Sequence, residues 1–159
     1  MVWGLFQIVL VLALYERLRE GAPVISQTAT AVGLIWATLV IAAGLIATLG
    51  ITTAVELYGT DPAQAGSFWA AIETVAAGLS GEAGEVLGGV WLLLIGWAAL
   101  RAQQLPRALA YLALVLGVAG VITVIPALAP AVFVYGIGLI GWWVWLGAVM
   151  LRSDTPASE

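Results

Sequence analysis

Long apolar stretches separated by short polar breaks form the pattern of this chain. The breaks collect proline, glycine and charged residues, whereas the stretches between them carry almost no charge. Uncharged apolar stretches of this length are typical of membrane-spanning helices. The pattern therefore predicts an all-α, polytopic transmembrane helical bundle with about five spans. The predicted spans are residues 2–18, 28–56, 85–100, 106–125 and 131–151.

One further helical segment, 62–79, has a different pattern. Its large apolar side chains recur at helical spacing, but Glu73 lies off that stripe near the middle of the segment. A carboxylate in the centre of a bilayer costs about 3 kcal/mol on insertion scales. We therefore expect an extracytoplasmic amphipathic helix that lies on the membrane surface or folds against the bundle. Asp61 followed by Pro62 is typical of the start of such a helix.

Composition agrees with a membrane environment. Of 159 residues, 63% are hydrophobic and 9% are charged, whereas a soluble domain has about a quarter of its residues charged. We expect one transmembrane domain, residues 1–152, and a cytoplasmic tail, residues 153–159.

The basic residues orient this domain. All five are arginines and all fall near predicted span ends: Arg17, Arg19, Arg101, Arg107 and Arg152. Arginine-bearing ends face the cytoplasm. The sequence therefore predicts an inner-membrane protein with its N-terminus outside and its C-terminus inside.

The residue inventory excludes several kinds of chemistry. The chain has no cysteine, histidine or lysine and a net charge of −4. It therefore lacks thiolates, the usual haem and zinc ligands, and a basic surface that could follow phosphates. We expect no catalytic residues, no cofactor, no metal and no nucleic-acid partner; the lipid bilayer is the expected surrounding.

Four carboxylates on the predicted outer side are candidates for transport or partner contacts: Glu56, Glu73, Glu82 and Glu85. The alternative is that they cap helices and line a solvated rim. Glu85 is the strongest candidate because it lies nearest to an apolar span.

Small residues within the spans are candidates for close helix packing: Gly84, Gly88, Gly117 and Gly141. They would pack helices within this chain or between chains. Trp3 and Trp69 suit the outer membrane interface. Tryptophans within spans pack in the interior, face lipid, or line a groove for a lipid, quinone or pigment. Gln7 is the one in-span amide.

Several short runs resemble a family of bacterial membrane proteins catalogued as domain of unknown function 4386. These runs are Leu14–Arg19, Ala31–Ala37, Leu45–Ile46, Phe68–Ile72, Gly88–Leu92 and Leu105–Tyr111 followed by Pro126. The resemblance covers about residues 5–152. It implies an α-helical integral membrane protein without an established activity. It also implies that similar members carry one more helix before the position of Val2.

Three functions remain open from the sequence. The first is a non-catalytic accessory or structural subunit that packs against other membrane helices, with a membrane-protein partner or as a homo-oligomer. The second is a small transporter or channel, alone or as an oligomer, with a polar path past Glu85 or the threonines of the second span. The third is an intramembrane enzyme acting on lipid, which would need converging polar groups in one cavity.

Overall fold

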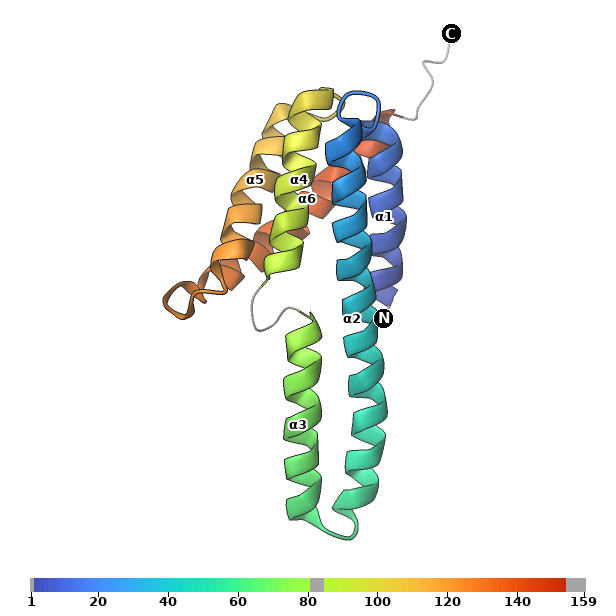
Figure 1. Cartoon of the computed structure of the whole chain (residues 1–159), viewed down its shortest axis with the longest axis vertical. Helices are drawn as coiled ribbons and strands as arrows, with labels where there is room; N and C mark the ends of the chain where they lie inside the picture. Colours follow the sequence, from blue (N-terminus) through green and yellow to red (C-terminus); the bar gives the residue numbers. More distant parts are fainter. Residues whose placement is uncertain (1, 81–84, 154–159) are drawn as a thin grey trace.

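The computed structural model describes residues 2–80 and 85–153, and every secondary-structure element in this part of the chain is a helix. A helix occupies most of each of the six segments predicted to be helical, which confirms the all-α class (Figure 1). The α-helices are α1 (Val2–Leu18), α2 (Pro23–Tyr58), α3 (Pro62–Ser80), α4 (Val86–Ala102), α5 (Arg107–Ile122) and α6 (Ala131–Ser153). A short 3₁₀ helix, Pro126–Leu128, precedes α6.

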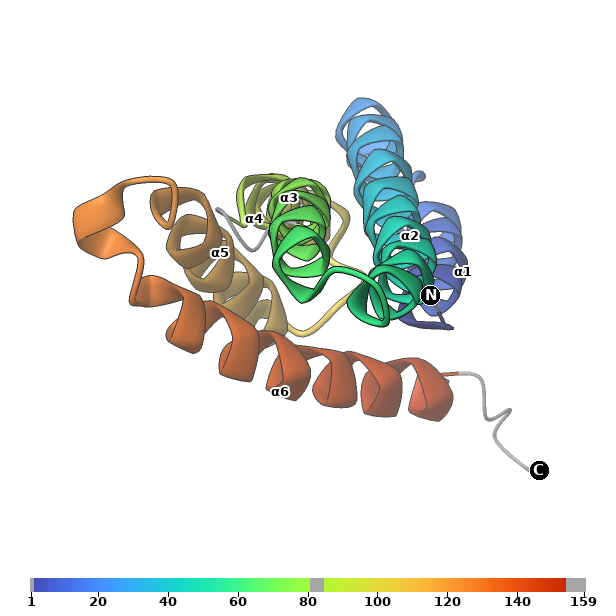
Figure 2. The same ribbon diagram turned by 90° about the horizontal axis from the view of Figure 1, so that it is seen from below.

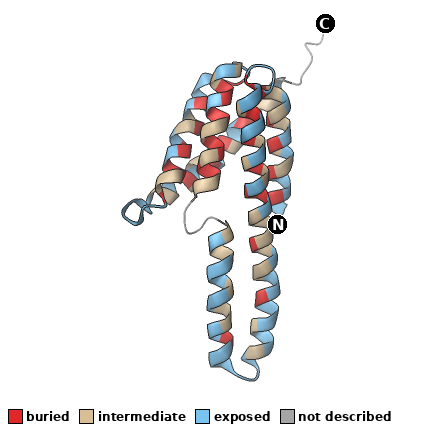
Figure 3. Cartoon of the chain, viewed as in Figure 1, coloured by how far each residue is buried: buried red, intermediate tan, exposed pale blue. Residues whose placement is uncertain are grey.

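Five helices pack into one bundle. The first half of α2 lies between α1 and α4, α5 packs closely on α4, and α6 runs obliquely across one face (Figures 1 and 2). Buried residues concentrate in this bundle (Figure 3). Trp91 of α4 and Trp142 of α6 are the largest fully buried side chains.

The arginine-bearing helix ends meet at one end of the bundle. α1, α4 and α6 each end there with an arginine in the last turn, and α2 and α5 begin there (Figure 1). The Nε–H of Arg17 donates to the carbonyl of Gln104 at 3.4 Å, which joins the last turn of α1 to the connection between α4 and α5. The bundle thus has one basic end.

The helices α2 and α3 form a hairpin that projects beyond the bundle at the opposite end (Figure 1). α2 has 36 residues, which at ~1.5 Å per residue make it about 54 Å long. Asp61 caps α3 as predicted, since its Oδ1 accepts from the N–H groups of Ala63 at 3.1 Å and Gln64 at 3.0 Å.

α2 begins at Pro23, ahead of the predicted span 28–56, because proline is well suited to the first turn of a helix, where its missing N–H costs nothing. α3 ends at Ser80, whose hydroxyl donates to the carbonyl of Ala77 at 3.3 Å.

Two helices of the described chain, α2 and α6, are long and apolar enough to cross a membrane. α4 and α5 are apolar but shorter. Five spans therefore remain a prediction. The segment predicted to be amphipathic, α3, folds alongside the second half of α2.

Candidate functional site

The candidate carboxylate Glu85 lies directly before α4 and is half-buried. Its backbone N–H donates to Oγ1 of Thr123 at 2.8 Å, and the Thr123 hydroxyl donates to the carbonyl of Gly120 at 2.6 Å. Thr123 thereby ties the start of α4 to the end of α5. A cavity of about 210 Å³ beside Glu85 is lined mainly by apolar side chains, among them Trp36 and Leu39.

The other candidate carboxylates lie elsewhere. Glu56 and Glu73 are exposed on the α2–α3 hairpin, and Glu82 falls outside the described residues. Glu73 lines a shallow cleft between α2 and α3. Within 2–80 and 85–153, no three Asp, Glu, His or Cys side chains come together as a metal site would require.

The predicted packing glycines behave differently from one another. Gly88 lies against Trp36 and Tyr135, and Gly117 lies against the backbone of Gly89 on the facing helix. Gly141 is exposed, and a Cβ atom there would meet no atom within 4 Å, so it does not pack against another helix of this chain. Gly84 falls outside the described residues.

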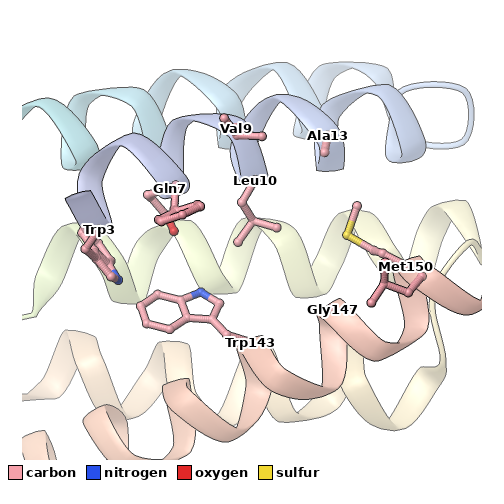
Figure 4. Close-up of a pocket in the computed structure, with 10 residues that line it drawn as sticks. Trp3, Gln7, Val9, Leu10, Ala13, Trp143, Gly147 and Met150 are labelled. Atoms are coloured by element: carbon pink, nitrogen blue, oxygen red, sulfur yellow. The ribbon is translucent and has the colours of Figure 1, made fainter.

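The largest cavity described here is a groove of about 740 Å³ between α1 and α6 (Figure 4). We call it the α1–α6 groove. Its residues are mostly apolar and none of them is charged: Trp3, Phe6, Gln7, Val9, Leu10, Ala13, Trp143, Gly147, Met150 and Leu151.

Two polar groups in this groove have no hydrogen-bond partner. Gln7 is 2% exposed and its Nε2 donates to nothing, and the Nε1 of Trp143 is likewise buried without an acceptor. The two side chains face each other across the groove (Figure 4). Trp3 lies beside them, its ring 5.5 Å from that of Trp143. The sequence identified Gln7 as the one in-span amide and in-span tryptophans such as Trp143 as candidates to line a groove. It did not predict that Gln7 and Trp143, which lie far apart in the chain, are neighbours.

A network of tryptophans continues from the groove into the bundle core. Trp3 contacts Trp36 at 5.0 Å, Trp36 contacts Trp91 at 5.8 Å, and Trp91 contacts Trp142 at 5.8 Å between ring centroids. The indole of Trp142 donates to the carbonyl of Leu109 at 3.1 Å. Trp3, at the start of α1, is partly buried and packs against this core.

The sequence prediction contained Trp36 only as one of the in-span tryptophans and as part of the run Ala31–Ala37, and did not single it out as a core residue. Its burial had a sequence signal, because Ala29, Trp36 and Ala43 recur every seven residues, and in the structure all three are buried. That spacing places them on one face of α2.

The fold and groove define an α-helical bundle protein with membrane-compatible helices and an apolar, uncharged groove. The chain belongs to the family described as "Domain of unknown function (DUF4386)", whose sequence model matches residues 1–150. This confirms the family resemblance. No curated protein and no solved structure matches this chain.

Proposed function

We propose that this protein is a non-catalytic subunit of a bacterial inner-membrane complex, with five spans and its basic end in the cytoplasm. The convergence of all arginine-bearing helix ends supports this orientation, because such ends face the cytoplasm. α1, α4 and α5, with 17, 17 and 16 residues, are about 24–26 Å long. Helices of this length suffice to cross a thin bilayer when the arginines at their ends extend toward the lipid headgroups.

In this orientation, the length of α2 supports a hairpin that projects beyond the bilayer. About 54 Å of helix exceeds the ~30 Å hydrocarbon core by on the order of 20 Å. This projecting half carries exposed apolar side chains: Leu45, Leu49, Ile51 and Val55. Apolar surface outside lipid is typical of a protein interface. The exposed apolar surface of the hairpin therefore favours contact with a protein partner over contact with lipid.

The observation that carries the proposal is a stripe of small residues on α3. Gly66, Ala70, Thr74 and Gly78 recur every four residues, so they share one face, and all four are exposed. A Cβ atom at Gly66 or Gly78 would meet nothing within 4 Å. Faces of this kind let a second helix approach closely. We call these four residues the α3 stripe and propose that a helix of another membrane protein packs on it.

The polar side chains of α2 do not favour the alternative of a transporter. Its threonine hydroxyls donate to carbonyls four residues earlier in the same helix, at 2.7–3.4 Å. These threonines are Thr28, Thr30, Thr38, Thr48, Thr52 and Thr53. Hydroxyls satisfied in this way need no water or ion beside them.

The test is purification from native membranes in mild detergent, followed by native mass spectrometry of the intact particle. We expect a stoichiometric foreign polypeptide with the unchanged protein and its loss from the double variant Gly66→Leu/Gly78→Leu. Gly141→Leu, on the open face of α6, is the matched control and should keep the partner. A particle that is a monomer or a self-oligomer in every case would refute the proposed partner.

A further inference from the structure

The α1–α6 groove contains hydrogen-bond donors that the fold leaves unused. The indole N–H of Trp142 donates to the carbonyl of Leu109, whereas the indole N–H of Trp91 in the bundle core has no acceptor. The Nε1 of Trp143 and the Nε2 of Gln7 have no such acceptor, although both are buried. Buried donors destabilise a protein unless another group accepts their hydrogens. The side chains of Gln7 and Trp143 lie on opposite sides of the groove (Figure 4), so one bound polar group is within reach of both.

The rest of the groove determines what kind of molecule carries that acceptor. From Leu10 and Ala13 to Met150 and Leu151 the lining is apolar, and no charged side chain contributes to it. Methionine adapts its shape to irregular apolar ligands. A volume of about 740 Å³ lies within the ~300–1,000 Å³ typical of small-molecule sites. The ligand therefore has an apolar tail and an uncharged head that accepts hydrogen bonds.

Charge distribution argues against a phospholipid as that ligand. An ester carbonyl at Gln7, in the second turn of α1, would place its phosphate near the start of this helix. All five arginines are in or next to the helix ends at the other end of the bundle, and the chain has no lysine. A phosphate would therefore find no basic side chain among the described residues around it. A neutral head has no such requirement.

Aromatic rings surround the two donors. Trp3, Phe6 and Trp143 all line this part of the groove, and planar aromatic faces favour a planar ring beside them. We propose that the α1–α6 groove binds a quinone with an apolar tail, whose ring carbonyl accepts hydrogen bonds from Gln7 and Trp143. The groove is separate from the α3 stripe, so this inference does not rest on the proposed partner.

The test uses the full-length protein in neutral detergent, titrated with decyl-benzoquinone while tryptophan fluorescence is recorded. We expect saturable quenching. Decylbenzene, with a similar ring and tail but no oxygen, should bind at least about tenfold more weakly in competition with the quinone. Monodecanoylglycerol, which offers an ester carbonyl, should also bind more weakly than decyl-benzoquinone in such a competition.

Variants then assign the binding to the two donors. Gln7→Leu and Trp143→Phe should each weaken quinone binding by about tenfold. Gln27→Leu makes the same chemical change at an exposed position of α2 and should leave binding unchanged. The proposal is overturned if decylbenzene binds as tightly as decyl-benzoquinone, or if monodecanoylglycerol binds more tightly than the quinone. It is also overturned if Gln7→Leu and Trp143→Phe both leave the affinity for the quinone unaltered. The ligand comparison needs only the unchanged protein, so it stands even if a variant misfolds.

Discussion

The close packing of α4 on α5 makes Gly117→Ala a sensitive test of the structure. A Cβ atom at Gly117 would lie 2.8 Å from the carbonyl oxygen of Gly89, whereas ordinary contacts begin at 3.4 Å. The two helices would have to separate by about 0.6 Å, which forfeits roughly a quarter of the dispersion energy at their contacts. Overpacking of this kind costs about 1–3 kcal/mol, and the higher helix propensity of alanine returns up to ~1 kcal/mol. We expect Gly117→Ala to lower the free energy of unfolding by about 1 kcal/mol.

Gly141→Ala is the matched control because no atom lies within 4 Å of the added Cβ. It should be neutral or up to ~1 kcal/mol stabilising, since only helix propensity changes. The free energies of unfolding of the two variants should therefore differ by about 1–2 kcal/mol. Unfolding of the detergent-solubilised protein by a denaturing detergent, followed by circular dichroism, measures this difference. Equal stability of the two variants would show that α4 and α5 are not in backbone contact at this point.

Two further predictions concern hydrogen bonds at helix ends. Thr123→Val removes the acceptor of the Glu85 N–H and should destabilise the protein by about 1–3 kcal/mol in the same unfolding assay; Thr123→Ser should retain most of that stability, and a Val variant as stable as Ser would contradict the link between α4 and α5. Asp61→Ala removes the cap of α3 and should cost about 1 kcal/mol, seen as faster amide hydrogen exchange in the first turn of α3. Asp61→Asn should keep the slow exchange, and equal rates in both variants would argue against capping by this side chain.

The sequence by itself determined the features that depend on neighbouring residues. Asp61 and Pro62 start α3 because a side-chain oxygen and the free N–H groups that it accepts from are only two or three residues apart. Arginines mark helix ends because charge is costly in apolar surroundings, and this holds wherever the helices pack. The family assignment also came from sequence patterns, and the sequence model of the family confirms it.

Only the tertiary structure decided which of these features meet. Gly117 and Gly141 are equivalent in an apolar sequence, but one faces a helix backbone and the other faces outward. Gln7 and Trp143 are separated by almost the whole chain, yet they line one groove. Helical periodicity gives the faces of each helix, while the pairing of faces depends on how all the helices fill space together. That is why the helices could be predicted from the sequence, whereas the α1–α6 groove and the open α3 stripe could not.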